Sequence, residues 1–305
     1  MADDGHILSG SLGCHGCARS FELLAGVPVL LPKEVPLVAT RTAARFAAEW
    51  TRWAQLRSYY ERQFFDWVAP VSRDDFIDRL VLEGGCGKGR HTSLIANFAR
   101  QVVALDLGES AWVAFANTRH LPNVHVVMGD VNRAPATRAF DVAFSVGVLH
   151  HLPDPRHGFS SLTSHVKEGG RVVAWVYGQE GNEWITRWVD PVRKTITSRL
   201  PPMLLHRLSW GPSAALVAVI RAFYRPDSQG RGPALPYGDY FASMYAFPVD
   251  EIHSIVFDQL VTPVAHYLTE AAVKHWFDSG FRDVVVRSHR GYSWTATALV
   301  ARGSA

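Results

Sequence analysis

The chain has 305 residues, of which 48% are hydrophobic and 19% charged, and its formal net charge is +3. This composition is typical of a well-packed soluble protein that is larger than one average domain. The small net charge argues against a nucleic-acid partner, because proteins that follow a phosphate backbone cluster many more basic residues. Three cysteines form no disulfide framework, and Asp3 and Asp4 stand where a signal peptide would be basic, so we expect a cytoplasmic protein.

The N-terminal leader contains a short cysteine motif. Cys14 and Cys17, with two residues between them, are half of the four-ligand set that structural zinc usually takes. A second cysteine pair is missing, and although His6 or His15 could complete a site, we expect a metal-free unit. Residues 21–32 have the pattern of a β-hairpin.

A segment rich in aromatic residues follows. Many of these residues recur every three or four positions, which predicts helices with aromatic faces. Aromatic residues at this spacing most often form core, and we expect most of these residues to do so.

The rest of the chain is organised around Arg79–His91, RLVLEGGCGKGRH. An apolar run ends at Glu83, alternating glycines follow, and a helical pattern begins at Arg90, as at the start of a βαβ unit. Glycine is needed where the backbone turns sharply or approaches a ligand closely. A carboxylate at the strand end would repel a phosphate but attract the cationic amino-acid portion of S-adenosylmethionine (SAM). The alternative is a glycine-rich turn without a ligand.

Later strand patterns end in residues that would extend this site. The second run leads to Asp106, which could accept hydrogen bonds from ribose hydroxyls. The third leads to Asp130, which could accept a hydrogen bond from an adenine amino group, while Leu107 and Val131 could enclose the ring. Either acid taken alone is more typical of an ordinary loop. The ordered set is what indicates a nucleoside site.

Together these patterns resemble class I SAM-dependent methyltransferases. The matching pieces are VLEGGCGKGRHT, VVALDLGES, VVMGDV, FDVAFSVGVLHHLPDP and KEGGRVVAWVY. Strands that alternate with helices predict a parallel sheet with helices on both faces. The resemblance implies an α/β fold with a seven-stranded Rossmann-like sheet, SAM as cofactor and S-adenosylhomocysteine as product.

The resemblance also implies which residues contact the cofactor. They are Glu83, Gly85, Cys86, Gly87, Arg90, Asp106, Leu107, Asp130, Val131, Val146 and Trp50. Of these, Cys86 is a small residue that the loop tolerates rather than a nucleophile, because methyl transfer from SAM needs no covalent enzyme intermediate. Similar leaders with a zinc ribbon precede many such enzymes, but with half of the ligands missing we expect no zinc here.

The resemblance also implies a lid, because the helices ahead of the first strand commonly cover the SAM pocket in such enzymes. The side chains that we expect to form it are Trp50, Trp53, Tyr59 and Tyr60. An aromatic face near the sulfonium would also attract it through cation–π contacts.

Residues 179–266 interrupt the α/β pattern and would form a helical cap that decides the substrate. A helix-like run at 203–210 precedes an apolar one at 214–224. The apolar run is far shorter than the roughly 20 residues that cross a bilayer, so we expect no membrane span. We expect a buried helix, although a helix that rests on a membrane surface or lines an apolar pocket would also fit.

The C-terminal residues would return to the sheet. Thr269 could cap a helix over 270–279, with Gly280 following it. Strands at 283–288 and 293–301 would complete the sheet with an antiparallel edge. The expected division is leader 1–35, aromatic lid 36–78, SAM-binding core 79–178, cap 179–266 and last helix and strands 267–305.

The reaction implied is an in-line displacement at the sulfonium methyl, for which positioning supplies much of the rate. An acceptor with an acidic proton also needs a general base, most often His. His150 and His151 follow the fourth strand at the mouth of the site, and His266 and Tyr267 are second candidates. The residues that we expect to hold the acceptor are Tyr59, Tyr60, Trp175, Tyr177 and Asp258.

Three functions fit these observations. We expect a small-molecule methyltransferase whose aromatic cap encloses an O, N, C or S acceptor, with no nucleic-acid partner. The alternatives are an enzyme that modifies RNA or protein, and a SAM-binding protein without methyl transfer. The acceptor and the oligomeric state stay open.

Overall fold

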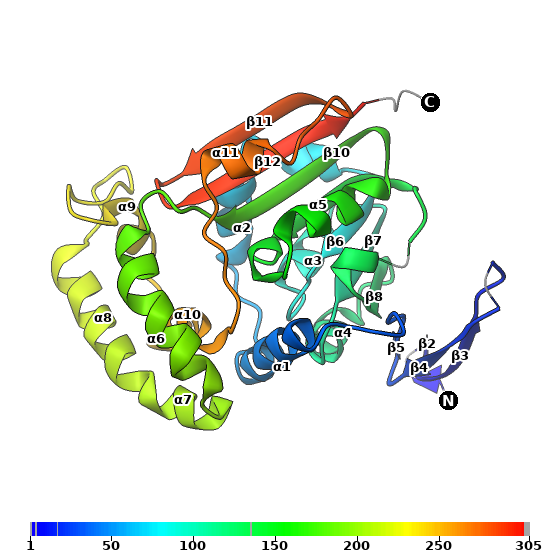
Figure 1. The fold of residues 1–305 in the computed structure, drawn as a ribbon, viewed down its shortest axis with the longest axis horizontal. Helices are drawn as coiled ribbons and strands as arrows, with labels where there is room; N and C mark the ends of the chain where they lie inside the picture. The colour runs from blue at the N-terminus through cyan, green and yellow to red at the C-terminus, as the bar shows by residue number, and fades with distance from the viewer. Residues whose placement is uncertain (1, 4, 17, 135, 302–305) are drawn as a thin grey trace.

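A seven-stranded sheet forms the centre of the computed structural model, which describes residues 2–3, 5–16, 18–134 and 136–301 (Figure 1). The strand order is β11-β12-β10-β9-β6-β7-β8. The strands are β6 (Leu80–Gly84), β7 (Gln101–Asp106), β8 (Val124–Met128), β9 (Phe140–Val146), β10 (Val166–Tyr177), β11 (Phe281–His289) and β12 (Ser293–Val300). Strands β6 to β10 run parallel, and β12 pairs antiparallel with β10 and β11. The expected fold and its antiparallel edge are confirmed.

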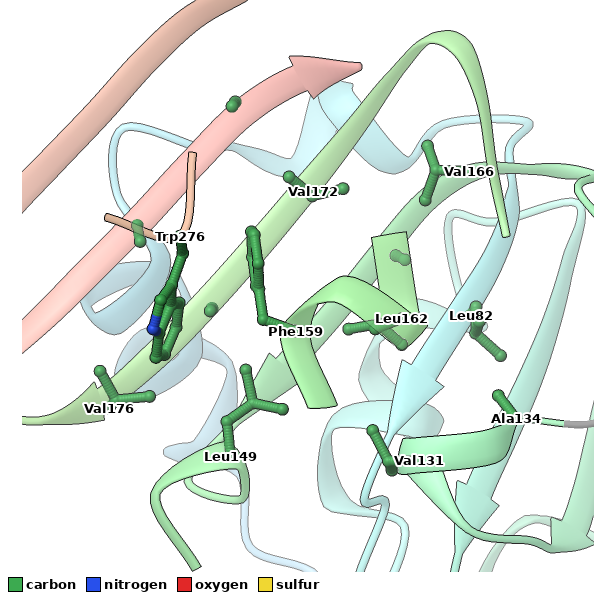
Figure 2. Close-up of a cluster of buried hydrophobic side chains, with 14 of the residues drawn as sticks. Leu82, Val131, Ala134, Leu149, Phe159, Leu162, Val166, Val172, Val176 and Trp276 are labelled. Atoms are coloured by element: carbon green, nitrogen blue, oxygen red, sulfur yellow. The ribbon is translucent and has the colours of Figure 1, made fainter. Parts of the chain in front are cut away.

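Helices cover both faces of this sheet because both faces are apolar. On one face, Phe159 and Leu162 of α5 point toward β10, and Trp276 packs beside them (Figure 2). On the other face, Phe64 of α2 contacts Phe144 of β9. The covering helices are α2 (Tyr60–Val68), α3 (Arg90–Ile95), α4 (Ser110–Thr118), α5 (Pro155–Ser164) and α11 (Glu270–Lys274), and short 3-10 turns lie at Arg73–Phe76, Val131–Arg133 and Leu149–His151.

The Thr269 cap is as expected, since its hydroxyl accepts a hydrogen bond from the Ala272 amide at 3.1 Å. The helix is shorter than predicted and ends at Lys274, so Gly280 does not terminate it.

The leader is a set of short strands that continues onto the edge of the large sheet. Its strands are β1 (Ala2–Asp3), β2 (His6–Ile7), β3 (Ser9–Gly13), β4 (Ser20–Leu24) and β5 (Val27–Pro28). The predicted hairpin is present as β4–β5, and the Leu30 amide donates to the Met128 carbonyl of β8 at 2.8 Å. The His6 ring lies 2.7 Å from the Arg119 carbonyl rather than beside Cys14. Cys17 lies outside the described residues, so the metal-free leader stays a prediction.

The remaining helices lie at one end of the sheet (Figure 1). They are α1 (Leu37–Arg52), a π-helical turn η4 (Ile185–Val189), α6 (Asp190–Thr195), the 3-10 turn η5 (Thr197–Arg199), α7 (Pro202–Leu208), α8 (Trp210–Phe223), α9 (Gly238–Ser243) and α10 (Val249–Val261). Helix α1 contacts both α4 and α10, and the later helices lie farther from the leader. The sequence pattern did not predict α10.

The expectation of a buried cap helix is wrong for much of α8. Val217 and Ile220 pack against α9 and α10, whereas Val219 and Phe223 are exposed. Among the described residues, one stretch, Pro202–Phe223, has the length and the mean hydropathy, 1.3, of a helix that could cross a membrane. The apolar stretch is therefore longer than the sequence pattern indicated, although α7 and α8 meet within it at Ser209.

Candidate functional site

A large cavity of about 1060 Å³ opens at the carboxyl ends of the parallel strands, where α/β sheets bind ligands. The glycine loop after β6 and the ends of β7, β8 and β9 form one side. Helices α1, α2 and α10 and the inner side of the cap form the other. The predicted residues that line it are Trp50, Tyr59, Gly85, Cys86, Gly87, Arg90, Asp106, Leu107, Asp130, Val131, Val146, His151, Trp175, Tyr177, Asp258 and Tyr267.

The glycine loop can approach the cavity because two of its positions have no room for a side chain. Gly85 and Gly87 have φ angles of +83° and +53°, which L side chains rarely adopt. A Cβ on Gly85 would lie 2.3 Å from Cγ2 of Val148, and one on Gly87 would lie 2.9 Å from Nε1 of Trp50. The loop therefore presents bare backbone to the cavity, as the fit of a bulky ligand requires.

Asp106 ties this loop to the end of β7. Its carboxylate accepts hydrogen bonds from the Gly87 amide at 2.8 Å, the Gly108 amide at 3.1 Å and the Ser110 hydroxyl at 2.6 Å. Burial raises its pKa, and these hydrogen bonds oppose the rise. Since Asp106 also lines the cavity, it can hold the loop and still accept a hydrogen bond from a ribose hydroxyl.

Asp130 occupies the end of β8 in a similar way. One carboxylate oxygen accepts from the Asn132 amide at 2.9 Å and from its side-chain nitrogen at 3.1 Å. Leu107 and Val131 line the cavity beside it. This arrangement suits an adenine ring between two apolar side chains with an acid at its edge.

Glu83 differs from its expected position. Its carboxylate accepts a hydrogen bond from the Thr92 hydroxyl at 2.5 Å and lies 3.8 Å from Nδ1 of His91, and it does not line the cavity. The buried strand end turns this side chain toward helix α3. A direct contact between Glu83 and the ammonium of SAM is therefore not part of this arrangement, and Glu83 instead fixes α3 against the strand.

Because Glu83 is buried, its folded-state pKa is raised from an ordinary value of 4.5 to about 8. Between those values the unfolded chain releases this proton and the folded chain keeps it, so stability falls as pH rises. Glu83→Gln is expected to remove this loss. Its advantage in unfolding free energy should grow by about 1 kcal/mol per pH unit between about pH 5 and 8.

Urea unfolding of both proteins across this range measures the effect. The variant Glu109→Gln removes an exposed carboxyl group and serves as control. A constant difference between wild type and Glu83→Gln at all pH values would show that Glu83 is already ionised in the folded protein.

The structure separates the candidate histidines. His151 lines the cavity, and its Nδ1 lies 2.7 Å from the Val264 carbonyl, which can only accept, so Nε2 carries no proton in the neutral ring. His150 is fully buried behind it, its two ring nitrogens have no hydrogen-bond partner, and it does not line the cavity. His266 does not line it either, and its amide donates to the His150 carbonyl.

Burial also makes these imidazoles weak bases. It lowers the pKa of His151 to about 3 and that of His150 well below its ordinary value. At neutral pH His151 is therefore uncharged and has little affinity for a proton. Its position fits the prediction better than its basicity does.

Two buried acids of the cavity influence each other: Asp258, which the sequence analysis expected to hold the acceptor, and Glu49, which it did not single out. Asp258 accepts a hydrogen bond from the Tyr177 hydroxyl at 3.0 Å, and Glu49 of α1 accepts one from Ser254 at 2.9 Å. Both acids line the cavity. Burial first, and then the charge of Asp258, raises the pKa of Glu49 well above its usual range. Burial raises the pKa of Asp258 to about 6.

The sequence around Glu49 contains a signal for its burial. It lies three residues after Phe46 and four before Trp53, and therefore on the aromatic face of its helix rather than on a solvated one.

Some of the aromatic residues predicted to contact the acceptor line the cavity, and others do not. Trp175 stacks on Trp67 with ring centroids 4.7 Å apart, and Tyr177 stacks on Tyr267 at 5.7 Å; all four line the cavity. Tyr60 is buried elsewhere, where its hydroxyl donates to Glu251 at 3.2 Å and accepts from Lys88 at 2.9 Å. The expectation that Tyr60 touches the acceptor is not supported by this position.

Trp53 lines a second hollow of about 650 Å³ beside the main cavity. The two hollows share Lys88 and Glu251. Trp53 is therefore outside the main cavity that we expected it to cover.

Comparison with known proteins finds that the central strands are similar to a described family. A family model described as "Methyltransferase domain" matches residues 82–174. A tRNA U34 carboxymethyltransferase of Pseudoalteromonas atlantica is 32% identical over 110 residues, which cover 35% of this chain and 34% of that protein. The protein of the same name from Idiomarina loihiensis is 33% identical over 129 residues, covering 39% and 40%. The chain thus spans about a third of the length of these relatives.

A solved structure with the same fold is the N-methyltransferase NodS from Bradyrhizobium japonicum in complex with S-adenosyl-L-homocysteine. It has 12% sequence identity and a TM-score of 0.50, and the alignment covers 87% of this chain and all of that one. The curated relatives are named for a tRNA substrate, which contradicts the expectations of a small-molecule acceptor and of no nucleic-acid partner. The weak net charge of the whole chain misled that inference, because it averages over local surfaces.

Proposed function

We propose that this protein is an enzyme which transfers a methyl group from SAM to a base of an RNA. The premise is that residues 82–174 form a class I SAM-dependent methyltransferase domain. A tRNA is the first RNA to test, because the curated relatives are named for one. The division into leader, lid, core, cap and last strands, and a cytoplasmic location, are part of this proposal.

The observation that carries the proposal is the two-ended character of the cavity. One end has the bare loop backbone, Asp106 and Asp130, which suit an adenosyl group. The other end is lined by aromatic rings on the core and cap, namely Trp67, Trp175, Tyr177, Tyr237, Tyr240, Tyr267 and Tyr292. Enzymes that act on a base extrude it from its strand into such a site and stack it on aromatic side chains.

The size of the cavity agrees with two occupants. Single drug-sized ligands usually occupy pockets of about 300–1,000 Å³. The cavity here, about 1060 Å³, leaves room for a base beside an adenosyl donor.

The second hollow supports a polymeric acceptor. Trp53 and Trp210 lie at its walls with the stacked rings of His206 and His253. The basic residues Arg52, Arg57 and Lys88 also line it, together with Glu251 and with Asp250, which pairs with Arg57 at 2.7 Å. Aromatic side chains with adjacent cations are what single-stranded nucleic acid binds. Because the two hollows adjoin, a nucleotide next to the extruded base could occupy the second one.

The residues around the cavity have different expected roles. A bound SAM would supply an electrophilic methyl carbon on its sulfonium sulfur. Asp106 and Asp130 would orient its adenosyl part, and Arg90, whose guanidinium lies 5.3 Å from the Trp67 ring centroid, lines the cavity beyond the loop. Asp258, with a pKa raised to about 6, is the group whose basicity suits the removal of a proton from the acceptor near neutral pH.

The activity itself can be tested with the full chain, tritiated SAM and total tRNA. After nuclease digestion, label should be found in one modified nucleoside, and it should be absent when the tRNA is pre-digested. Label that appears only with small-molecule extracts would overturn the RNA acceptor.

The ring of Tyr240, at the aromatic end of the cavity, should contribute to RNA binding and not to SAM binding. Tyr240 lines the cavity and its ring centroid lies 4.6 Å from that of Tyr292. Tyr240→Ala is expected to raise the KM for RNA about 5- to 150-fold, since stacking on one aromatic ring is worth roughly 1–3 kcal/mol per base. SAM affinity should not change.

Tyr240→Phe is the matched variant because it keeps the ring and loses only the hydroxyl. It should retain the wild-type KM. If both variants lose affinity equally, the hydroxyl and not stacking is responsible, and if neither does, the base lies elsewhere.

A further inference from the structure

The outer side of the cap has an unusual concentration of exposed apolar side chains. Ten of the nineteen exposed large hydrophobic residues in the described part of the chain lie between Trp184 and Phe223. Eight of them, which we call the cap face, are 42–71% exposed: Trp188, Val192, Ile196, Met203, Leu204, Leu208, Val219 and Phe223. Scattered exposed hydrophobic residues are normal, whereas a concentration of this kind indicates an interaction surface.

The cap face belongs to helices that are already packed on their inner sides. Leu205 of α7 and Ile220 of α8 are buried against α10, and Leu216 of α8 lines the cavity. Helix α8 is thus apolar on its outer as well as its inner side. A helix that is apolar all round is usually buried in a protein or in lipid. The outer side of α7 and α8 lies at the rim of the molecule, facing away from the sheet (Figure 1).

The same segment is strongly basic. Residues 184–226 contain seven arginines and lysines and a single acid, Asp190, which gives a net charge of +6. The rest of the chain has 24 basic and 27 acidic residues. Asp190, the one acid of the segment, is paired with Arg193 and Lys194. The other basic residues of the segment therefore have no acid within it to neutralise them. A helical segment that exposes apolar side chains, with tryptophan among them, and carries a strong positive charge has the composition of helices that lie in a membrane interface.

We infer that the cap face docks the protein onto an anionic lipid surface, with the apolar side chains inserted among the acyl chains and the arginines at the headgroups. Two other occupants fit less well. A second copy of the chain would bring together two copies of a segment whose formal net charge is +6. RNA would satisfy the arginines but leave Met203, Leu204 and Val219 without a partner, because a phosphate backbone offers no apolar surface.

The inference does not depend on the proposed reaction. It can be tested by flotation of the full chain with vesicles of phosphatidylcholine, with or without one third phosphatidylglycerol. The protein should float with the anionic vesicles, remain at the bottom with the neutral ones, and dissociate as salt is raised.

The double variant Trp188→Ser/Phe223→Ser should lower the partition coefficient about tenfold or more, because both side chains would be inserted. The matched control, Ile77→Ser/Val285→Ser, removes two exposed apolar side chains away from the cap and should bind like the wild type. Arg207→Gln/Arg221→Gln should weaken binding to the anionic vesicles about tenfold or more, because each basic residue near the surface contributes to the attraction. Thermal unfolding of each variant verifies that it folds.

Three results would overturn the inference. They are failure of the wild type to float with anionic vesicles, equal binding by the cap-face variant and its control, and self-association that the cap-face substitutions abolish. Loss of RNA binding in the Arg207→Gln/Arg221→Gln variant without any vesicle binding by the wild type would assign the surface to RNA instead.

Discussion

Gly85→Ala is expected to lower the affinity for SAM between about 10- and 100-fold, because the added methyl group has no space. Its Cβ would lie 2.3 and 2.5 Å from the two methyl groups of Val148. Either the loop or Val148 must shift, and both line the cavity. Overpacking of this kind costs typically 1–3 kcal/mol, and each 1.4 kcal/mol is a tenfold change in affinity.

Gly147→Ala separates this steric effect from backbone strain. Gly147 also lines the cavity and has a φ of +79°, but a Cβ there would meet no atom within 4 Å. It should therefore lose stability, like any left-handed glycine that is replaced, yet keep more of its SAM affinity than Gly85→Ala. Adding Val148→Ala to Gly85→Ala should restore part of the binding. Calorimetric titration of the four proteins with SAM measures all of these effects, and equal losses at both glycines would exclude the steric explanation.

Asp258→Asn should reduce kcat for transfer to RNA by about 100-fold or more, the size expected for loss of a general base. The substitution keeps an oxygen that can accept the hydrogen bond from Tyr177. Because burial raises the pKa of Asp258 to about 6, the wild-type kcat should rise with pH through about 6 and then level off. The variant should lack this rise, and its SAM affinity should remain that of the wild type.

His151→Gln is the comparison for this experiment. With a pKa lowered to about 3, His151 is already deprotonated over the tested range and should contribute no rise near pH 6. A variant Asp258→Asn that retains the wild-type kcat and pH profile, together with a large loss in His151→Gln, would return the role of base to the histidine.

The strand ends were predictable because their chemistry is local. Each parallel strand of the core is a short apolar run, and the residue after it must lie at the same edge of the sheet. Asp106, Asp130 and Val146 therefore reach one cavity from positions far apart in the sequence. The glycine positions follow from the same turn. Glu83 differs because one side-chain rotation decides whether the acid faces a ligand or the helix behind it.

The acceptor end could not be predicted in the same way. It is assembled from the lid, the cap and the last strands, and their mutual positions depend on packing between segments some 200 residues apart. The hydrogen bond between Ser254 and Glu49 is an example, and Tyr60 with Glu251 is another. No spacing rule connects such pairs. The exposure of α8 was missed for a related reason, because an apolar helix has the same sequence whether its outer face meets protein, water or lipid.

The central claim is that the strand ends hold an adenosyl sulfonium donor, and calorimetric titration of the full chain with S-adenosylhomocysteine tests it most directly. The account predicts binding of one ligand per chain, weakened at least about tenfold by Asp106→Ala through loss of a ribose contact and of the loop's anchor. Absence of binding, or preferential binding of a phosphate-bearing nucleotide such as ATP, would contradict it.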